Sequence, residues 1–457
     1  MKLKLLILAV ALCIVNAEYK SYEGYKVFKI VPEAEKDVKI LKGLEKVTEY
    51  QFWTDVIQIG EDVRIMVSPE KLSKFEEYLT AQGIKASIAI EDVQKSIDAQ
   101  LRRPKINRLN NNYDWNYYQN LEEIHKWMDE IVDQHADVAS IVTIGTSREG
   151  RDIKGVKIDY RKRENATVGM LEGGIHAREW ISPATITWII NEFLTSTDAE
   201  VRALAENIVW HIFPVVNPDG YEYTFTNNRM WRKNRNNESF TSCSQWNLND
   251  DMSNGVDLNR NFDFLWMTVG ASNNPCAETY AGTVANSELE TRAIINYVES
   301  LQSNGDHLLY YFAFHSFSQL VLVPYSHVAG AQVLEAPNYG DMFEIAIKGM
   351  DKLKERNGTE YIVGTSADIL YHVSGSSFDW AKGEADIPIV YLFELRDDGD
   401  YGFLLPPELI KDNNREIVDG LIEMDRVTRQ LGYYHRSSGF MHTLNAIIIL
   451  LSLIIVM

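Results

Sequence analysis

The stretch ATVGMLEGGIHAREWISPATITWIINEFLTS (residues 166–196) places an apolar strand directly before a helix. The strand ends in a pair of glycines, and Ser182 and Pro183 are residue types favoured at the N-cap and first turn of a helix. His176 and Glu179 stand in the turn between the two elements. A strand, a turn and a helix in this order are typical of α/β proteins, whose ligand sites collect beyond the strand ends.

Further apolar runs, rich in β-branched and aromatic residues, lie at 207–216, 307–316 and 386–395. Such runs suit central strands that are buried on both faces. The segments 139–147 and 154–160 indicate another pair of strands. The larger, later part of the chain is therefore predicted to form an α/β fold with a mixed, mostly parallel central sheet flanked by helices.

The earlier part of the chain has a different pattern, in which elements follow the order β-α-β-β-α-β. This order predicts a small open α+β sandwich of the ferredoxin-like type. The expected strands are 25–31, 49–54, 62–68 and 84–90, and the expected helices are 33–46 and 69–83.

A charged helix and a basic stretch, residues 91–108, connect the two parts. A trypsin-like protease could cut here, and because proline follows Arg103, we expect the cut at Lys105 or Arg108. The small sandwich is then a removable pro-segment with its connecting helix. The alternative is an ordinary linker between two domains.

Composition narrows the class of protein. With 457 residues, 45% of them hydrophobic, the chain is long enough for two domains. A net charge of −20 argues against nucleic acid and against an acidic membrane surface as partners. Any anionic ligand must therefore be held by a local cluster of arginines.

Both ends of the chain carry targeting patterns. Residues 1–17 combine a basic start, a short apolar stretch and small residues at the cleavage position, which predicts a secretory signal peptide. The tail, residues 436–457, has small residues at Ser437, Ser438 and Gly439 and ends in an apolar run. This pattern favours attachment to the outer cell surface through a lipid anchor or a membrane helix. A tail without function is the alternative.

Secretion bears on the cysteines. Cys13 leaves with the signal peptide, and for Cys243 and Cys276 a disulfide is the default in an oxidising compartment. Glycosylation sequons, which fit the same compartment, begin at Asn165, Asn237 and Asn357.

Imidazole and carboxylate groups stand at the ends of predicted strands. His176 and Glu179 follow one strand, His315 ends a second, and Glu394 ends a third. Any one of them alone is best read as a polar strand cap. Together, two imidazoles and one carboxylate form the ligand set of a catalytic zinc ion, with the fourth position left for water. Glu394 then remains as the carboxylate that metal-assisted hydrolysis needs beside that water.

Arginines cluster in two other motifs. NRMWRKNR holds Arg229, Arg232 and Arg235, and GVDLNRNF holds Asn259 and Arg260. In a chain of negative net charge, arginines beside a metal site indicate a substrate with its own carboxylate, which a guanidinium binds at two points.

These residues resemble the A/B-type zinc metallocarboxypeptidases in their secreted, digestive-type zymogen form. The resemblance runs from about Tyr25 to about Gly432 and includes the pro-segment. Its motifs occur in the family's order with compatible spacing, and they are specific only as a set. They are GGIHAREWIS, VVNPDGYEYT, NRMWRKNR, GVDLNRNF, PCAETYAG, HSFSQLVLVPY, LYHVSGSSFDWA and FELRDDGDYGFLLP.

The resemblance implies a role for each site residue in hydrolysing the C-terminal residue of peptides and proteins. It implies one zinc ion per chain, held by His176, Glu179 and His315. It implies Glu394 as general base and Arg232 as the group that polarises the scissile carbonyl. It further implies that Asn259, Arg260 and Tyr371 bind the terminal carboxylate, that Arg178, Arg229 and Phe403 line more distant subsites, and that Cys243 pairs with Cys276.

The residue before the DW pair lies at the base of the family's side-chain pocket, and here it is Phe378. An acidic residue there would favour basic C-terminal residues, so Phe378 predicts an apolar preference. Asp368 could admit basic ends if it pointed into the pocket, but we expect it to face solvent. Phe317 departs from the tyrosine that often follows the family's His-Ser pair. The walls that match by position are Leu322, Ser326, Ser366, Leu370, Val373 and Leu392.

The expected organisation is a signal peptide (1–17), a pro-segment (18–108), a catalytic domain (109–435) and the apolar tail (436–457), in a monomer. One alternative is an amidohydrolase for N-acyl amino acids, which would lack the carboxylate clamp and the pro-segment. Another is a non-catalytic binding protein, which would be expected to lose its general base or a metal ligand.

Overall fold

The computed structural model describes residues 19–44, 50–54, 57–103, 113–162, 166–238, 241–243, 253–329, 332–333 and 335–435. The predicted signal peptide, the sequon at Asn165, the junction with Lys105 and Arg108, and the apolar tail lie outside these residues. Within the described part of the chain, no helix has the length and apolar character needed to cross a membrane.

The larger domain is built on an eight-stranded sheet of order β13-β10-β14-β9-β7-β8-β6-β5. The central neighbours β8, β7, β9 and β14 are parallel, whereas β5, β6 and the β10–β14 pair are antiparallel. The predicted mixed sheet is confirmed. Its strands are β5 (Ala139–Thr146), β6 (Asp152–Ile158), β7 (Thr167–Gly173), β8 (Val209–Phe213), β9 (His307–Ser316), β10 (Leu320–Val323), β13 (Ile362–Thr365) and β14 (Ile389–Leu395).

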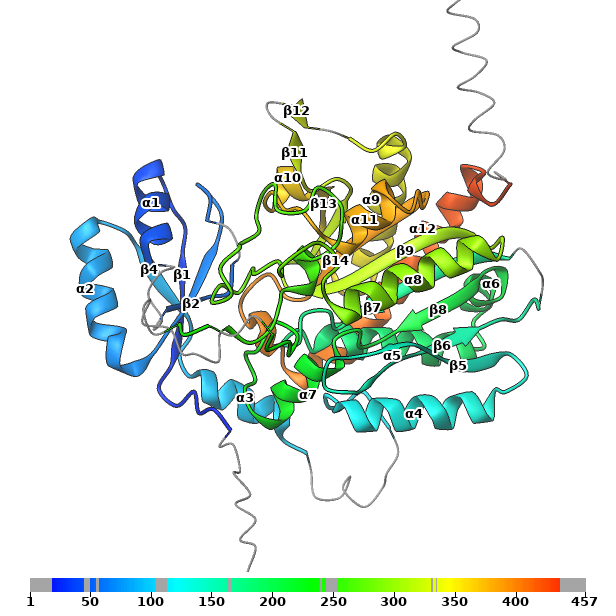
Figure 1. Ribbon diagram of the computed structural model, residues 1–457, viewed down its shortest axis with the longest axis horizontal. Helices are drawn as coiled ribbons and strands as arrows, with labels where there is room; N and C mark the ends of the chain where they lie inside the picture. The colour runs from blue at the N-terminus through cyan, green and yellow to red at the C-terminus, as the bar shows by residue number, and fades with distance from the viewer. Residues whose placement is uncertain are drawn as a thin grey trace, which may run out of the picture.

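Helices cover both faces of this sheet (Figure 1). Along β9, Tyr310 and Phe312 enter one apolar core while Tyr311 and Ala313 enter the other, because successive side chains of a strand point to opposite faces. The first core is closed by α4 (Leu121–Gln134), α5 (Ile181–Thr195), α6 (Ala199–Asn207), α9 (Tyr339–Asn357) and α12 (Ile410–Gln430), and the second by α8 (Leu289–Ser303) and α11 (Ser377–Gly383). Smaller elements are α7 (Pro218–Thr226), α10 (Ser366–Ile369), β11 (Val328–Ala329) and β12 (Gln332–Val333).

The predicted small sandwich forms a four-stranded antiparallel sheet of order β2-β3-β1-β4. Its apolar core lies between the sheet and two helices, and the ferredoxin-like order is confirmed. The elements are β1 (Lys26–Ile30), α1 (Glu35–Leu44), β2 (Tyr50–Phe52), β3 (Val63–Val67), α2 (Leu72–Gln82) and β4 (Ala86–Ile90), followed by α3 (Val93–Leu101).

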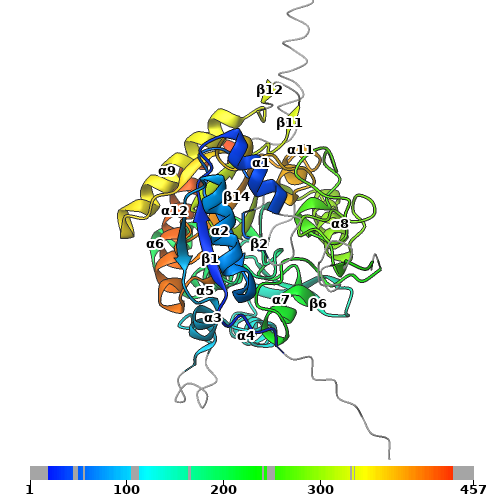
Figure 2. The ribbon, with the colours of Figure 1, turned by 90° about the vertical axis from the view of Figure 1, so that its left-hand side faces the viewer.

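This small domain packs against the larger one, as Figures 1 and 2 show from two sides. Trp53 of the small domain lies 5.3 Å from Phe403 of the large domain, measured between ring centroids. On α3, Gln100 donates to the carbonyl of Leu405 at 2.9 Å. The two domains therefore share a buried apolar contact that is closed by hydrogen bonds.

Ser182 does not cap α5, contrary to the prediction. The helix begins at Ile181, and the Ser182 hydroxyl instead accepts from the Gly174 N–H at 3.1 Å and donates to the Phe314 carbonyl at 2.6 Å. It therefore joins the ends of β7 and β9. A Cβ on Gly173 would lie 2.4 Å from the Ser182 oxygen, so this close approach requires glycine.

Candidate active site

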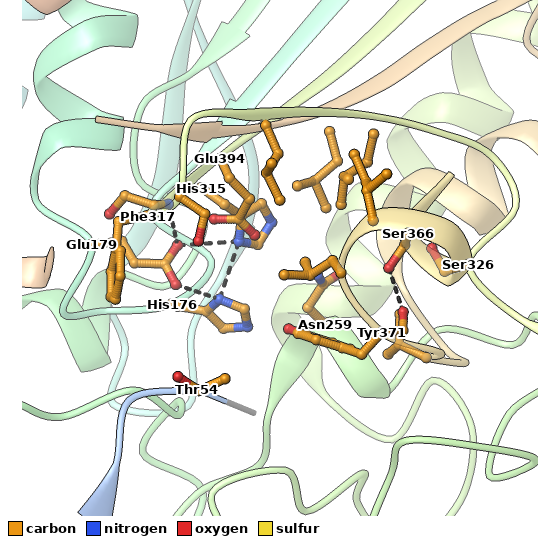
Figure 3. A pocket seen from close by; sticks show the side chains of 18 of the residues that line it. Thr54, His176, Glu179, Asn259, His315, Phe317, Ser326, Ser366, Tyr371 and Glu394 are labelled. Carbon is orange, nitrogen blue, oxygen red and sulfur yellow. Dashed lines mark hydrogen bonds and ion pairs between the residues drawn. The ribbon is translucent and has the colours of Figure 1, made fainter. Parts of the chain in front are cut away.

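The three predicted metal ligands meet where β7 and β9 end (Figure 3). His176 Nδ1 lies 2.8 Å from Glu179 Oε1, and His315 Nδ1 lies 3.1 Å from Glu179 Oε2. The two Nδ1 atoms are 3.1 Å apart, and all three side chains are buried. The donor atoms, which lie within 4.8 Å of one another, fit one cation such as zinc.

Asp257 completes this arrangement, although sequence reasoning did not single it out. Its Oδ1 lies 3.0 Å from His176 Nε2. Because a carboxylate only accepts, the neutral imidazole carries its proton on Nε2 and presents the lone pair of Nδ1 to a metal. The signal was present in the motif GVDLNRNF, since Asp257 stands two residues before Asn259.

Asp257 is kept ionised by the positive groups around it, chiefly two arginines. Arg232 donates to Asp257 Oδ2 at 3.0 Å, and the Arg260 guanidinium lies 3.9 Å from the same oxygen. Burial alone would raise the pKa of Asp257, but Arg232, Arg260 and His176 together hold it well below its usual range. The carboxylate is therefore ionised and also orients Arg232, whose guanidinium lies 4.0 Å from Glu179.

Asn259 and Arg260 lie together in a short 3-10 helix, Leu258–Arg260, whose N-cap is Asp257. Arg260 is held by hydrogen bonds to the carbonyls of Gly270, at 2.8 Å, and Asn259, at 3.0 Å. Its guanidinium lies 6.0 Å from the centre of the Tyr371 ring. All three predicted clamp residues line the same pocket as the metal ligands.

Glu394 reaches the same pocket from β14. In the parallel ladder it pairs with His315 of β9. Neighbouring residues of parallel strands point the same way, so the carboxylate of Glu394 lies on the side of the sheet that carries the imidazole (Figure 3).

The pocket has an apolar end. All the residues that the family resemblance predicted for the walls of the side-chain pocket lie there. Phe378, expected at the pocket floor, is buried and lines the pocket, and Ile369, which was not predicted, adds to its wall. Asp368 is exposed and accepts from the Thr365 hydroxyl at 2.7 Å, so it lies outside the pocket as expected. The predicted lining residues are Leu322, Ser326, Ser366, Leu370, Val373 and Leu392.

Arg178 and Arg229 are the exception among the predicted site residues. Both are fully buried and neither lines the pocket, so the structure does not place them at a subsite. Arg229 donates to Gln100 of α3, in the small domain, at 2.9 Å. The Arg178 guanidinium lies 4.3 Å from the centre of the ring of Phe403, a residue of the large domain. Phe403 itself does line the pocket.

The small domain also contributes directly to the pocket. Trp53, Thr54, Glu61, Asp62 and Arg64 are among its lining residues. Asp62 pairs with Arg64 at 2.9 Å and with Lys29 at 2.6 Å, which are both in the small domain. The small domain thus covers the mouth of the site.

Cys243 and Cys276 form the expected disulfide, with their Cα atoms 5.8 Å apart. The closed loop includes Asn259 and Arg260. The bond therefore tethers the segment that carries the clamp.

Family models match both domains. One described as zinc carboxypeptidase matches residues 124–420, and one described as carboxypeptidase activation peptide matches residues 28–100. The chain is 41% identical to zinc carboxypeptidase A 1 of Anopheles gambiae over 94% of this chain and 95% of the relative. It is 33% identical to carboxypeptidase B of Bos taurus over 91% of this chain and 95% of the relative.

Solved structures of carboxypeptidases and related proteins align with the chain over most of its length. The structure of thrombin-activatable fibrinolysis inhibitor aligns with a TM-score of 0.78 at 28% identity, over 89% of this chain and 100% of its own. Carboxypeptidase A of Helicoverpa armigera aligns with a TM-score of 0.76 at 26% identity, over 91% of this chain and 100% of its own.

Proposed function

Because the chain belongs to the zinc carboxypeptidase family, we propose that it removes single apolar residues from the C-termini of peptides and proteins. It is a metallocarboxypeptidase with an activation peptide, and hence a zymogen. The observation that carries the proposed specificity is one pocket that contains a metal-ligand set, an arginine clamp and the apolar floor of Phe378.

His176, Glu179 and His315 hold the zinc ion in this proposal, with Asp257 fixing the orientation of His176. When bound, zinc supplies Lewis acidity that activates water and polarises a carbonyl. The donor set fits this ion because imidazole nitrogen and carboxylate oxygen are its usual ligands.

Arg260, Asn259 and Tyr371 bind the terminal carboxylate of the substrate. That carboxylate is the feature that all C-termini share, and a guanidinium recognises it at two points. Since the clamp and the metal ligands line one pocket, binding the carboxylate places the last peptide bond beside the metal ligands. The enzyme thereby counts one residue from the end.

Glu394 and Arg232 act on the scissile bond. Glu394 takes a proton from the attacking water and passes it to the leaving amine. Arg232, held by Asp257 at 3.0 Å, donates to the carbonyl oxygen as negative charge develops on it.

One substitution and one substrate pair test this proposal. After tryptic activation, the wild type should cleave a peptide ending in leucine and spare its C-terminal amide, since the amide gives Arg260 no carboxylate. Glu394→Gln should retain zinc and lose activity by at least about 10²-fold. Equal cleavage of acid and amide would identify an endopeptidase, and retained turnover in Glu394→Gln would reject the general base.

We further propose that the protein is secreted and is activated by a trypsin-like protease. The Cys243–Cys276 disulfide supports an oxidising compartment, because such bonds are rare in cytosolic proteins. Mass spectrometry of the culture medium tests both: the chain should be found there, and its mature form should begin just after Lys105 or Arg108.

A further inference from the structure

A buried carboxyl group, Glu172, lies within the sheet and has no part in the chemistry described above. It occupies the sixth position of β7, directly before Gly173, and only 1% of its surface is exposed. Its strand neighbours Met170 and Leu171 belong to the apolar cores. Burying a carboxyl group in such surroundings is costly unless its oxygens are hydrogen-bonded, so its presence requires a reason.

Glu172 is bonded to the first residue of α11. The Ser377 hydroxyl donates to Glu172 Oε1 at 2.5 Å, and Ser377 is itself fully buried. The next residue of the helix is Phe378, the floor of the pocket. A single side-chain bond thus joins the strand leading to His176 and the helix that forms the floor.

Ser377 also binds Asn259, one of the proposed carboxylate-binding residues. The Ser377 N–H donates to Asn259 Oδ1 at 2.9 Å. Because a backbone N–H can only donate, the atom facing it must be the amide oxygen, and the NH₂ group of Asn259 remains as a donor for a substrate carboxylate. Glu172, Ser377 and Asn259 are therefore consecutive members of one hydrogen-bonded chain.

Glu172 is better suited to a structural role than to that of an acid or base. We call the hydrogen-bonded chain of Glu172, Ser377 and Asn259 the brace. Burial raises the pKa of Glu172 to about 7, while the hydroxyls of Ser377 and Tyr311 lower it. Whether protonated or ionised, its oxygen can accept from Ser377. The brace therefore does not depend on one protonation state.

We propose that Glu172 is a positioning residue, which acts through Ser377 to fix Asn259 and the start of α11 relative to the strand that leads to His176 and Glu179. This inference rests on the proposed function, because it takes Asn259 as a carboxylate-binding residue. The brace sets the spacing between the clamp and the metal ligands, and its loss weakens substrate binding more than the chemical step.

Five variants of the full-length protein, one of them a double variant, test the brace after tryptic activation. Glu172→Ala removes the acceptor, Glu172→Gln retains an acceptor oxygen, and Ser377→Ala removes the hydroxyl while keeping the N–H that binds Asn259. Glu290→Ala is the matched control, because Glu290 is also 1% exposed with a pKa raised by burial to about 7, and it does not line the pocket. KM and kcat are measured with a blocked peptide ending in leucine and with its amide, together with zinc content.

Glu172→Ala and Ser377→Ala should each raise KM about tenfold or more, with kcat within about threefold and zinc content unchanged. Glu172→Gln should restore a KM within about threefold of the wild type, and the double variant Glu172→Ala, Ser377→Ala should be no worse than either single change. If Glu172→Ala does not fold, Ser377→Ala carries the same test.

If the wild type cleaves the acid and spares the amide, the proposed function stands. Two results would then overturn the inference about the brace. They are a normal KM in Ser377→Ala, and an equal rise in KM in Glu290→Ala. A wild type that fails to discriminate acid from amide overturns the proposed function, and this inference with it.

Discussion

The Nε2 atom of His176 lies 3.0 Å from Asp257 Oδ1, and the other oxygen of that carboxylate binds Arg232 at 3.0 Å. One buried aspartate thereby orients both a metal ligand and the arginine that we propose to act on the scissile carbonyl. Its loss should affect metal binding and catalysis together.

Asp257→Asn should lower the affinity for zinc by about 10- to 100-fold, because the His176 proton loses its charged acceptor. Equilibrium dialysis against a graded series of chelator measures this change. Asp219→Asn is the control, since Asp219 is equally buried and binds Arg151 and Ser147 instead of a metal ligand. The same zinc affinity in Asp257→Asn and the wild type would contradict the role.

Phe378→Asp should change the preferred C-terminal residue. A carboxylate at the pocket floor binds a lysine or arginine side chain and loses the apolar contact, so the ratio of kcat/KM for leucine to that for arginine should fall by about tenfold or more. Peptides that differ only in their last residue provide the measurement. Phe378→Leu, which keeps the floor apolar, should retain the wild-type order, and a retained order in Phe378→Asp would show that another residue sets specificity.

Asp379 gives a pH dependence with a defined sign. The Ser326 N–H is shared between its two oxygens, and burial raises its pKa from 3.8 to about 7. The folded state therefore binds this proton more tightly than the unfolded state. Protonated Asp379 therefore adds to the free energy of unfolding. This contribution is fully present below the pKa of Asp379 in the unfolded state. It is lost as the pH rises through its folded-state pKa of about 7, at up to about 1.4 kcal/mol per pH unit.

Asp379→Asn should remove this slope, so the variant should gain stability relative to the wild type as the pH rises from 4 to about 7. Urea denaturation across that range measures the difference in the free energy of unfolding. Asp133→Asn, at an exposed position of α4, should leave the slope unchanged. Parallel pH profiles of Asp379→Asn and the wild type would refute the assignment.

The uncut chain should be nearly inactive on peptides, because five residues of the small domain line the mouth of the site. Trypsin should raise kcat/KM by about 10²-fold or more, because removing the small domain lets the substrate reach the groups that position it. A chain carrying Lys105→Gln and Arg108→Gln should resist this activation. Full activity before the cut would remove the role of the small domain as an inhibitor.

The local patterns of the sequence were sufficient for much of the fold. The strand at 307–316 was predicted at its observed bounds, because a continuous apolar run between polar segments has few other solutions. His176, Glu179 and His315 could be grouped because they stand at the ends of apolar runs that predict strands of one sheet. The wall of the pocket required the resemblance to a family, since its residues come from β10, α10, β14 and the segments after β10 and α10, which are far apart in the sequence.

The remaining features depend on contacts that no local pattern encodes. Ser182 has the residue type of a helix cap, yet its hydroxyl is used between two strands. Arg178 was predicted to face substrate, but it is buried and its guanidinium packs against the Phe403 ring. Glu172 could not be distinguished from a polar interruption of a strand until Ser377 was seen beside it.

Phe403 contacts Trp53 of the small domain and also lines the pocket of the large one. Latency and the proposed substrate preference therefore involve the same residue, Phe403. A substitution that reshapes this ring to suit a new peptide also changes how firmly the uncut chain is silenced. Within a lineage, the two properties are expected to co-vary, so a change of substrate preference should leave paired changes at these two positions.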